Sequence, residues 1–345
     1  MRHLVISYHT CPLDRPGRDL AGGMNVLLKS FLAHTTWPTD LVTRGFGEYE
    51  RHDVKPGVAI HRLPCGASRP WTRELAWDRL PAFRESFERW LNGRLFDVAS
   101  AHYWMSGTLL RDLRIPSGIM FHTLQVQKGK PVGELERRRR DMEKELVARF
   151  PAAFLHWHDL RYAESLLGCV KGSVVRAGHG WEVVSAFREE REPLVFGWAA
   201  RRDAVKNFDQ ARELLTTLRM KSSKVRMLVA GMEEENEEGI TFLGQLETEE
   251  MAQFYAEIDQ LWNLSHYETF GLGVLEALTQ GATVGLLPGS DWGRRLRRLG
   301  IDSSPGRGWS QRDRRTALLL SRAYHWSRAL PSWERWLSRL ATARR

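Results

Sequence analysis

Cysteine is scarce in this sequence, and long apolar runs are absent from it. The 345 residues include three cysteines, Cys11, Cys65 and Cys169, which are widely spaced and belong to no paired motif. We therefore expect neither a disulfide framework nor a zinc site built from cysteine. No apolar run reaches the roughly 18 residues that a membrane-spanning helix needs. The first residues, MRHLVISYHT, predict a buried strand rather than a signal peptide, and a cytoplasmic location is the expectation.

Two glycine-rich nucleotide signatures are also missing. No Walker A sequence occurs, and Gly271-x-Gly273-x-x-Glu276 lacks the third glycine of a dinucleotide fingerprint. A glycine pair, Gly22-Gly23, does precede a helix expected to begin near Met24. Such a pair lets the backbone approach a ligand closely, and a helix N-terminus favours an anion. The pair is therefore a candidate phosphate loop, with a plain loop-to-helix turn as the alternative.

Acidic residues are outnumbered. There are 51 Lys and Arg against 42 Asp and Glu, which gives a net charge of +9. This excess favours an anionic partner, and nucleic acid, anionic lipid and phosphorylated small molecules all fit it. Because no basic motif is interleaved with aromatic residues, we expect no nucleic-acid partner. The excess is steepest after Asp291, which leaves a weak peripheral membrane contact open.

The length of the chain predicts two domains, each able to bury its own core. Apolar runs alternate with helical patterns, which favours doubly wound α/β domains. We expect the first domain at 1–172 and the second at 173–325, followed by a C-terminal helix at 326–345. The expected strands are 3–8, 40–43, 58–63, 96–101, 117–121, 152–157, 173–175, 194–199, 225–230, 240–243 and 261–265, and the longer expected helices are 72–92, 134–150, 159–167, 208–218 and 248–258.

Two of these helices are rich in charge. The helix at 72–92 has an apolar face and several arginines, which fits either an anionic membrane surface or packing on a sheet, and we favour packing. The helix at 134–150 contains ELERRRRDMEKEL. Opposite charges at helical spacing predict a solvated surface, because four consecutive arginines point around most of the circumference. We interpret this helix as structural and leave an acceptor contact from one arginine open.

The most informative stretch is 259–287, where a short strand is followed by a polar loop and a helical pattern. Glu268 lies in the loop and Glu276 two turns further on. Both carboxylates can therefore reach the pocket at the helix N-terminus, where unpaired backbone amides point. Carboxylates accept hydrogen bonds from hydroxyls, and amides receive anionic oxygens. The stretch predicts a site for a sugar joined to a nucleotide diphosphate, and the alternative is a solvated helix face.

Cations and a histidine occupy other strand ends. Arg201 and Lys206 lie between a predicted strand and a predicted helix, where they form a diphosphate clamp by Coulomb attraction. The alternative is a pair of surface cations. His122 follows the strand at 117–121, and a neutral imidazole there can donate to or accept from a substrate hydroxyl. A satisfied structural histidine is the alternative. Lys128 either holds an acceptor phosphate or is a solvated lysine.

Several motifs resemble those of one family. The string Glu268-Thr-Phe-Gly-Leu-Gly-Val-Leu-Glu276 looks like the donor-site signature of retaining glycosyltransferases of the GT-B fold, family 4. The strings His9-Thr-x-Pro-Leu-x-x-Pro-Gly and Ala21-Gly-Gly-Met-Asn25 are similar to the opening of members that act on inositol phosphate and of sucrose-phosphate synthases. His102-Tyr-Trp-Met-Ser-Gly107 and His122-Thr-Leu resemble the family's turns at strand ends. The resemblance implies an α/β chain with two Rossmann-like doubly wound domains facing across a cleft, the donor on the C-terminal domain and the acceptor on the N-terminal one.

The resemblance also implies a role for each motif. The implied donor site comprises Gly22, Gly23, Arg201, Lys206, Glu268, Thr269, Phe270, Gly271, Leu272 and Glu276, with Glu276 at the ribose and Glu268 at the sugar hydroxyls. The implied acceptor site comprises Asn25, His102, Tyr103 and Lys128. The implied catalytic residues are His122 beside the sugar, Arg201 and Lys206 at the leaving diphosphate, and Glu268. The expected reaction transfers a hexosyl group, with retention of configuration, from a nucleotide-diphosphate sugar to a hydroxyl group of an acceptor. UDP is the favoured nucleotide. The acceptor is unidentified, and a phosphorylated one would fit the site.

The sequence departs from the family pattern in several places. Arg176-Ala-Gly178-His-Gly-Trp-Glu182 stands where relatives have Pro-Asn-Gly-Val-Asp, Ala200 replaces a glycine, and the match weakens beyond 288. A second hypothesis is therefore a catalytically degenerate relative that binds a sugar nucleotide or a protein partner without transfer. Ser332-Trp-Glu-Arg335 resembles the family's terminal Ser-Trp helix, which implies that 326–345 packs back on the first domain.

Metal-binding motifs are not apparent. No Asp-x-Asp motif occurs, so we expect no metal and no cofactor if Arg201 and Lys206 neutralise the leaving group. The sequence does not predict an oligomeric state.

Overall fold

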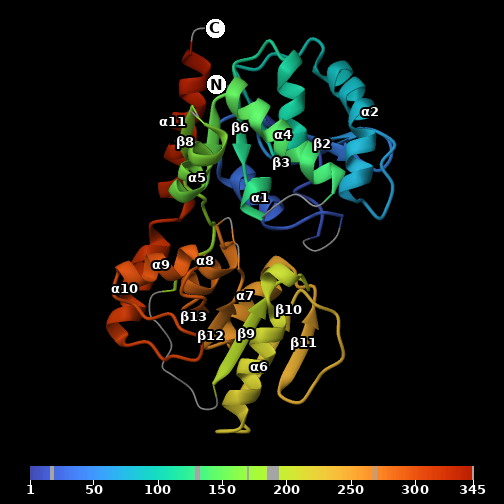
Figure 1. Cartoon of the computed structure of the whole chain (residues 1–345). Helices are drawn as coiled ribbons and strands as arrows, with labels where there is room; N and C mark the ends of the chain where they lie inside the picture. The colour runs from blue at the N-terminus through green and yellow to red at the C-terminus, as the bar shows by residue number, and fades with distance from the viewer. Residues whose placement is uncertain are drawn as a thin grey trace. The chain divides into compact units, whose positions relative to one another are not determined.

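The structure, a computed structural model, describes residues 1–15, 19–128, 133–168, 171–184, 194–266, 268 and 270–343, with only the backbone described at 126, 128, 166 and 167 (Figure 1). The chain divides into two compact units. Unit 1 is Met1–Gly178 with Trp326–Arg345, and unit 2 is His179–His325. The divisions fall at 178/179 and 325/326, where the sequence led us to expect 172/173 and 325/326. Each unit is built on its own largely parallel sheet with helices, which confirms the predicted α/β fold class.

Unit 1 contains an eight-stranded sheet in the order β3-β4-β2-β1-β5-β6-β7-β8. All neighbouring strands are parallel except β3 and β4, which are antiparallel. A parallel sheet buries both of its faces, and the central strands β1, β2 and β5 are accordingly buried along their whole length. The strands span His3–Ile6 (β1), Thr39–Gly45 (β2), Glu50–Lys55 (β3), Val58–Pro64 (β4), Val98–His102 (β5), Ser117–Phe121 (β6), Ala152–Phe154 (β7) and Gly172–Val174 (β8).

Helices cover both faces of this sheet. Leu4 and Ile6 belong to the core that includes the apolar face of α2, whereas His3 faces Phe31 of α1, as the two-residue period of a strand requires. The apolar face of α2 is thus buried in the core, in agreement with the packing interpretation. The helices of unit 1 span Gly23–His34 (α1), Arg73–Leu91 (α2), Trp104–Gly107 (α3), Glu134–Arg149 (α4), Trp157–Leu167 (α5) and Trp326–Thr342 (α11), with 3-10 turns at Thr108–Asp112 (η1) and Gln125–Lys128 (η2).

Helix α11 returns to unit 1 after the chain has formed unit 2, and it packs on α1, β5 and β6. Trp333 stacks on Phe31 with ring centroids 4.6 Å apart, and Trp326 Nε1 donates to Ser30 Oγ at 2.6 Å. Gly118 in β6 permits this approach, because a Cβ there would stand 2.8 Å from Leu340. The close contact therefore requires glycine at this point of the sheet.

Unit 2 contains five parallel strands in the order β11-β10-β9-β12-β13. Its core includes Phe196, Trp198, Met227 and Trp262. Because parallel strands end at the same edge of a sheet, the loops after the neighbouring strands β9 and β12 lie beside each other. The elements span Val195–Ala199 (β9), Ala204–Lys206 (η3), Phe208–Arg219 (α6), Arg226–Ala230 (β10), Ile240–Gly244 (β11), Thr248–Glu257 (α7), Gln260–Asn263 (β12), Leu272–Thr279 (α8), Thr283–Leu286 (β13), Asp291–Arg298 (α9) and Gln311–Arg322 (α10).

Some elements differ from expectation. Strand β3 was not predicted, because its residues, ERHDVK, are exposed or half-buried at the sheet edge and show no apolar pattern. The strand expected at 152–157 ends at Phe154 instead. His156 caps α5, its Nδ1 accepting a hydrogen bond from the His158 amide at 3.0 Å. None of the described helices is apolar over a length that could cross a membrane.

Candidate active site

Lys206 and Glu268 meet in unit 2, although 62 positions separate them. Lys206 ends the short turn η3 after β9, and Glu268 lies in the loop after β12. The Lys206 ammonium donates directly to Glu268 Oε1, and both side chains are 24% exposed. The same Oε1 accepts from Ser265 Oγ at 2.9 Å and from Asn263 Nδ2 at 3.4 Å. The carboxylate is therefore held rigidly by the end of β12, and it fixes the lysine.

Arg201, the predicted partner of Lys206 in the diphosphate clamp, is more exposed than Lys206. Arg201 lies just past the end of β9, is 54% exposed, and is 3.5 Å from Asp203. The loop after β12 is tied to this loop, because the His266 amide donates to the Val205 carbonyl at 3.0 Å. Arg201 and Lys206 thus share one loop at the carboxyl edge of the sheet, where open α/β sheets bind ligands. Lys206 is held there by Glu268, whereas Arg201 is more exposed and has a longer contact, with Asp203.

Helix α8 begins without a side-chain cap. Its N-cap, Gly271, has φ of 72°, a left-handed conformation that favours glycine. A Cβ at Gly271 would stand 3.0 Å from Trp292, whose indole donates to the Phe270 carbonyl. The amides of Val274 and Leu275 donate to the Gly271 carbonyl, and no side chain caps the helix. The first two amides of α8, those of Leu272 and Gly273, are therefore the donors that this end offers to an anion. Thr269, predicted to belong to the same motif, lies outside the described residues.

Glu276 lies one turn further along α8 and is partly buried. Tyr255 of α7 donates its hydroxyl to Glu276 Oε2 at 3.0 Å. Burial raises the pKa of the Glu276 carboxyl to about 7, and the hydrogen bond from Tyr255 offsets only part of that effect. Trp181 packs edge-on against Tyr255, with ring centroids 5.9 Å apart. The carboxyl is thus positioned by a phenol whose ring packs against an indole.

In unit 1, His102 and His122 form a direct pair, with His102 Nδ1 3.0 Å from His122 Nε2. Burial lowers the pKa of His122 to about 3, and burial together with His122 lowers the pKa of His102 well below its ordinary value. Both imidazoles are therefore neutral. Tyr103 follows β5 with φ of 76° and stacks on His9, with ring centroids 4.1 Å apart. Three of the predicted residues of the N-terminal half, His102, Tyr103 and His122, are thus brought together.

Arg139 in α4 is a site residue that the sequence did not single out. Its side chain is 3% exposed and its Nε donates to Glu143 at 2.6 Å. Its Nη2 donates to the carbonyl and the hydroxyl of Thr123 at 2.7 and 2.8 Å, and the guanidinium carbon lies 4.8 Å from the Tyr103 ring centre. The expectation of a wholly solvated helix is therefore wrong at this turn. The i,i+4 pairing of Arg139 with Glu143 was visible in the sequence, but four consecutive arginines concealed which one faces inward.

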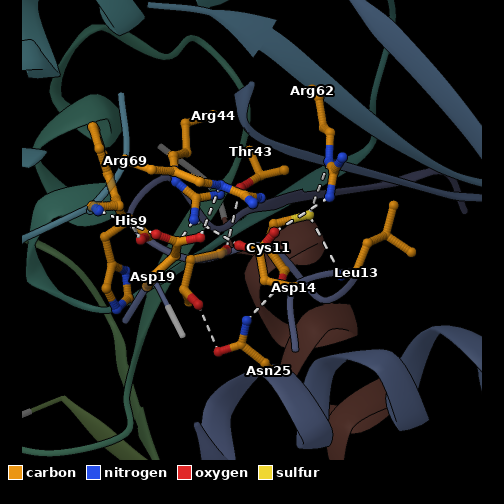
Figure 2. A network of polar contacts seen from close by, with 12 residues as sticks. His9, Cys11, Leu13, Asp14, Asp19, Asn25, Thr43, Arg44, Arg62 and Arg69 are labelled. Carbon is orange, nitrogen blue, oxygen red and sulfur yellow. Dashed lines mark hydrogen bonds and ion pairs between the residues drawn. The ribbon is translucent and has the colours of Figure 1, made fainter. Parts of the chain in front are cut away.

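The loop between β1 and α1 is held by its own polar groups (Figure 2). Asn25 is 2% exposed; its Nδ2 donates to the Cys11 carbonyl, and its Oδ1 accepts from the Thr10 hydroxyl and the Gly22 amide. The Asn25 amide therefore fixes the loop, and its predicted acceptor contact stays a prediction. Gly22 and Gly23 stand at the start of α1, and a Cβ on Gly22 would meet no atom within 4 Å. The Lys128 side chain lies outside what the structure describes.

Asp14 anchors the other half of this loop (Figure 2). Its carboxylate accepts from Arg44 Nη2 at 2.6 Å and from Arg62 Nη2 at 3.3 Å. The Arg44 guanidinium is fully buried and lies over the rings of Phe46 and Trp71. In the sequence, the signal that could have identified this anchor is an arginine at the end of an apolar strand, in the string Val42-Thr-Arg-Gly-Phe46.

Comparisons with known proteins show what this chain is similar to. Residues 182–284 match the family model described as Glycosyl transferases group 1. The D-inositol 3-phosphate glycosyltransferase of Corynebacterium urealyticum is 28% identical over 334 residues, which cover 82% of this chain and 78% of that protein. The enzyme of the same name from Corynebacterium jeikeium is 32% identical over 162 residues, covering 43% of this chain and 39% of that protein. The chain thus spans about two fifths of the length of that relative.

Solved structures give the fold. Sucrose-phosphate synthase from Thermosynechococcus elongatus superposes with a TM-score of 0.79 at 18% identity, covering 99% of this chain and 100% of that one. Anabaena HepE in complex with UDP and glucose gives 0.64 at 13% identity, covering 99% and 100%. Residues 182–284 are thus similar to group 1 glycosyltransferases, and the chain has the GT-B fold. This confirms the predicted fold and glycosyltransferase relationship, while the family number and the arrangement across a cleft stay predictions.

The group 1 domain match falls on the donor half of the predicted site. The matched range contains Arg201, Lys206, Glu268 and Glu276, which are the cations and carboxylates described above. The histidine pair and Arg139 belong to unit 1 and lie outside that range. The predicted donor and acceptor residues therefore rest on different observations.

Proposed function

We propose that this chain transfers a hexosyl group, with retention of configuration and without a metal, from a nucleotide-diphosphate sugar to a hydroxyl of a phosphorylated acceptor. UDP is the proposed nucleotide. The observation that carries the proposal is the Lys206–Glu268 pair at the carboxyl edge of the unit 2 sheet, next to the uncapped start of α8. A lysine, a carboxylate and free backbone amides are the groups that a sugar diphosphate needs.

The charges of the donor half fit a departing diphosphate. In the proposed reaction Lys206 and Arg201 neutralise the negative charge that develops as the glycosidic bond breaks, in the role that a metal ion has in other enzymes. Glu268 holds Lys206 in place and keeps its second oxygen for the sugar hydroxyls. Glu276, fixed by Tyr255, would accept from the ribose hydroxyls. The similarity to HepE, whose structure holds UDP and glucose, supports this choice of donor for the present chain.

The acceptor half favours an anion. Arg139 keeps a buried positive charge between Thr123 and the Tyr103 ring, and His122 directly precedes Thr123 in the chain. An arginine supplies planar, paired hydrogen bonds to phosphate. Relatives named D-inositol 3-phosphate glycosyltransferases have a phosphorylated acceptor in their name. We propose a phosphorylated acceptor for this chain as well, without proposing that it is an inositol.

The experiment is donor hydrolysis by the full chain, with Lys206→Met as the test and Lys221→Met as the matched control. Lys221 is an exposed lysine of the same unit. A second measurement is the stabilisation of the folded chain by UDP. UDP at about 100 times its Kd should raise the free energy of unfolding of the parent and the control by about 2.7 kcal/mol, and that of the test variant by much less. Loss of one charge-stabilising donor should lower the turnover of Lys206→Met by about 10²- to 10³-fold. Turnover by Lys206→Met equal to that of the control would contradict the clamp.

A second candidate is a relative that binds the sugar nucleotide without transferring it. The observation in its favour is the altered turn at 176–182. A Cβ on Gly178 would stand 2.4 Å from Trp326, so the glycine at this point serves packing against α11. Stabilisation of the parent by UDP without any donor hydrolysis would favour this candidate over transfer.

A further inference from the structure

Three histidines and one serine form a continuous hydrogen-bonded chain inside unit 1, here called the histidine chain. His3 Nε2 and Ser100 Oγ are 2.8 Å apart. Ser100 Oγ is 3.1 Å from His102 Nε2, and His102 Nδ1 is 3.0 Å from His122 Nε2. Strands β1, β5 and β6 are parallel neighbours, and the two-residue period of a strand brings these side chains onto one face of the sheet. The histidine chain connects the middle of the core with the predicted catalytic histidine.

Aromatic rings cover the histidine chain. Phe31 lies edge-on to His3, with centroids 6.1 Å apart, and Trp333 stacks on His102 at 6.0 Å. His3, Ser100 and His102 are 0% exposed, whereas His122 is 7% exposed. His122 is therefore the end of the histidine chain that a ligand can reach. Burial lowers the pKa of His3 to about 3, as it does for His122, so the imidazoles carry no charge near neutral pH.

The hydrogens of a chain of neutral imidazoles and a hydroxyl can be placed in only a few ways. A neutral imidazole has one N–H and one bare nitrogen, and a hydroxyl has one hydrogen. Among the described residues Ser100 has no hydrogen-bond partner besides His3 and His102. The hydrogens must then all point outward, ending at an N–H on His122 Nδ1, or all point inward, ending at an N–H on His3 Nδ1.

The inner end decides between the two arrangements. His3 Nδ1 is buried and has no partner in the described part of the chain. With the hydrogens pointing inward, this nitrogen would carry a buried N–H without an acceptor. With the hydrogens pointing outward, it carries only a bare lone pair. Orphaned buried N–H groups are rarer in folded proteins than under-satisfied acceptors, so the outward arrangement is favoured.

A purely structural role does not explain the histidine chain. Neighbouring positions of the same strands, such as Val5 and Val98, fill the core with apolar groups. A buried polar network that leaves one of its own atoms unpaired is less stable than apolar packing of the same volume. The feature that the histidine chain adds is a defined proton position on the one member that is accessible.

We propose that His3, Ser100 and His102 are positioning residues that hold His122 in the tautomer with its proton on Nδ1. His122 then presents a hydrogen-bond donor to an oxygen of the bound sugar. The identity of that ligand rests on the proposed function, whereas the tautomer of His122 does not. A free histidine side chain in water prefers the proton on Nε2, so the histidine chain reverses the ordinary preference.

The test is nuclear magnetic resonance of the full chain labelled with ¹⁵N-histidine, which distinguishes protonated from bare ring nitrogens. The His122 signals are assigned by their loss in His122→Asn. Ser100→Ala interrupts the histidine chain, and Ser7→Ala is the matched control. Ser7 is equally buried but donates to the Thr10 carbonyl instead. His3→Leu removes the inner end of the histidine chain without changing β5. This variant replaces Ser100→Ala in the test if Ser100→Ala does not fold.

The parent and Ser7→Ala should show the proton on Nδ1 of His122. Ser100→Ala or His3→Leu should show it on Nε2 or spread over both nitrogens. A parent with the proton on Nε2, or an unchanged tautomer in both variants, overturns the proposal. Where the parent hydrolyses a UDP-sugar, loss of one hydrogen bond should lower kcat in Ser100→Ala by about three- to tenfold and leave KM within about twofold. A parent without any hydrolysis refutes the proposed function, yet the tautomer measurement still decides this inference.

Discussion

Replacing Glu276 with glutamine tests the electrostatics of the donor half in unit 2. The Glu276 carboxyl is partly buried and accepts a 3.0 Å hydrogen bond from Tyr255. Burial raises its pKa from the ordinary 4.5 to about 7. Glutamine keeps the shape of the side chain and an oxygen for Tyr255 but carries no charge. We therefore expect Glu276→Gln to be more stable than the parent at any pH where the Glu276 carboxyl of the unfolded parent is ionised.

The sign and the size follow from proton linkage. The folded chain keeps the proton on Glu276 up to a pH of about 7, whereas the unfolded chain releases it near pH 4.5. The stability that this proton contributes is fully present below pH 4.5 and is lost, at about 1.4 kcal/mol per pH unit, as the pH rises toward 7. The whole interval corresponds to about 3 kcal/mol. Because the side chain is partly exposed, solvent screening reduces the expected difference to about 2 kcal/mol.

The assay is calorimetric unfolding of the parent and of Glu276→Gln between about pH 5 and pH 8. The advantage of the variant should be small at the acidic end and about 2 kcal/mol at the basic end, or about 4–8 °C in Tm for a domain of this size. Glu249→Gln, an exposed glutamate of α7, is the matched control and should track the parent at every pH. A Glu276→Gln advantage that does not change with pH would refute the reasoning.

Three further variants test packing and backbone. Trp333→Ala empties a site that is 0% exposed, so calorimetry should show a loss of about 3–5 kcal/mol in unit 1. Arg139→Met should cost about 3–5 kcal/mol because it leaves the buried Glu143 carboxylate without the positive charge of the arginine. In denaturant unfolding, a double variant, Arg139→Met with Glu143→Leu, should recover part of the loss, because the Gln125 amide then loses its acceptor. Gly271→Ala should cost more than Gly300→Ala in the same measurement. Both glycines have positive φ, but only at Gly271 would the new Cβ lie 3.0 Å from a neighbouring indole. Equal costs would remove the steric argument.

The sequence was most informative about unit 2. Lys206 and Glu268 could be placed together because each follows a strand, and neighbouring parallel strands end at the same edge. The contact between them, the ammonium donating to the carboxylate, was not itself predicted, because it depends on β9 and β12 being neighbours in the sheet. The exposed position of Arg201 could not be foreseen, since rotamers of a long side chain in a loop depend on neighbours that periodicity does not reveal.

Unit 1 was harder to predict at its polar positions. The strands could be located from their apolar residues, but the pairing of His3 with Ser100 and of His102 with His122 depends on register between three strands. A shift by one residue would turn every one of these side chains to the other face. Arg139 was concealed for a related reason, because the orientation of α4 about its own axis decides which of its arginines is buried.

The placement of buried polar groups bears on the choice between a transferase and a non-catalytic relative. Three pairs of this kind lie among the predicted site residues or beside them: Arg139 with Glu143, His102 with His122, and Glu276 with Tyr255. Burying polar groups costs free energy that apolar packing of the same volume does not, so a chain that needed only the fold could replace all of them. Their joint presence favours a working site. If the parent binds UDP but hydrolyses no donor, we would look for the cause outside these pairs. The altered turn at 176–182 and Ala200 are the described places where the chain departs from the family pattern.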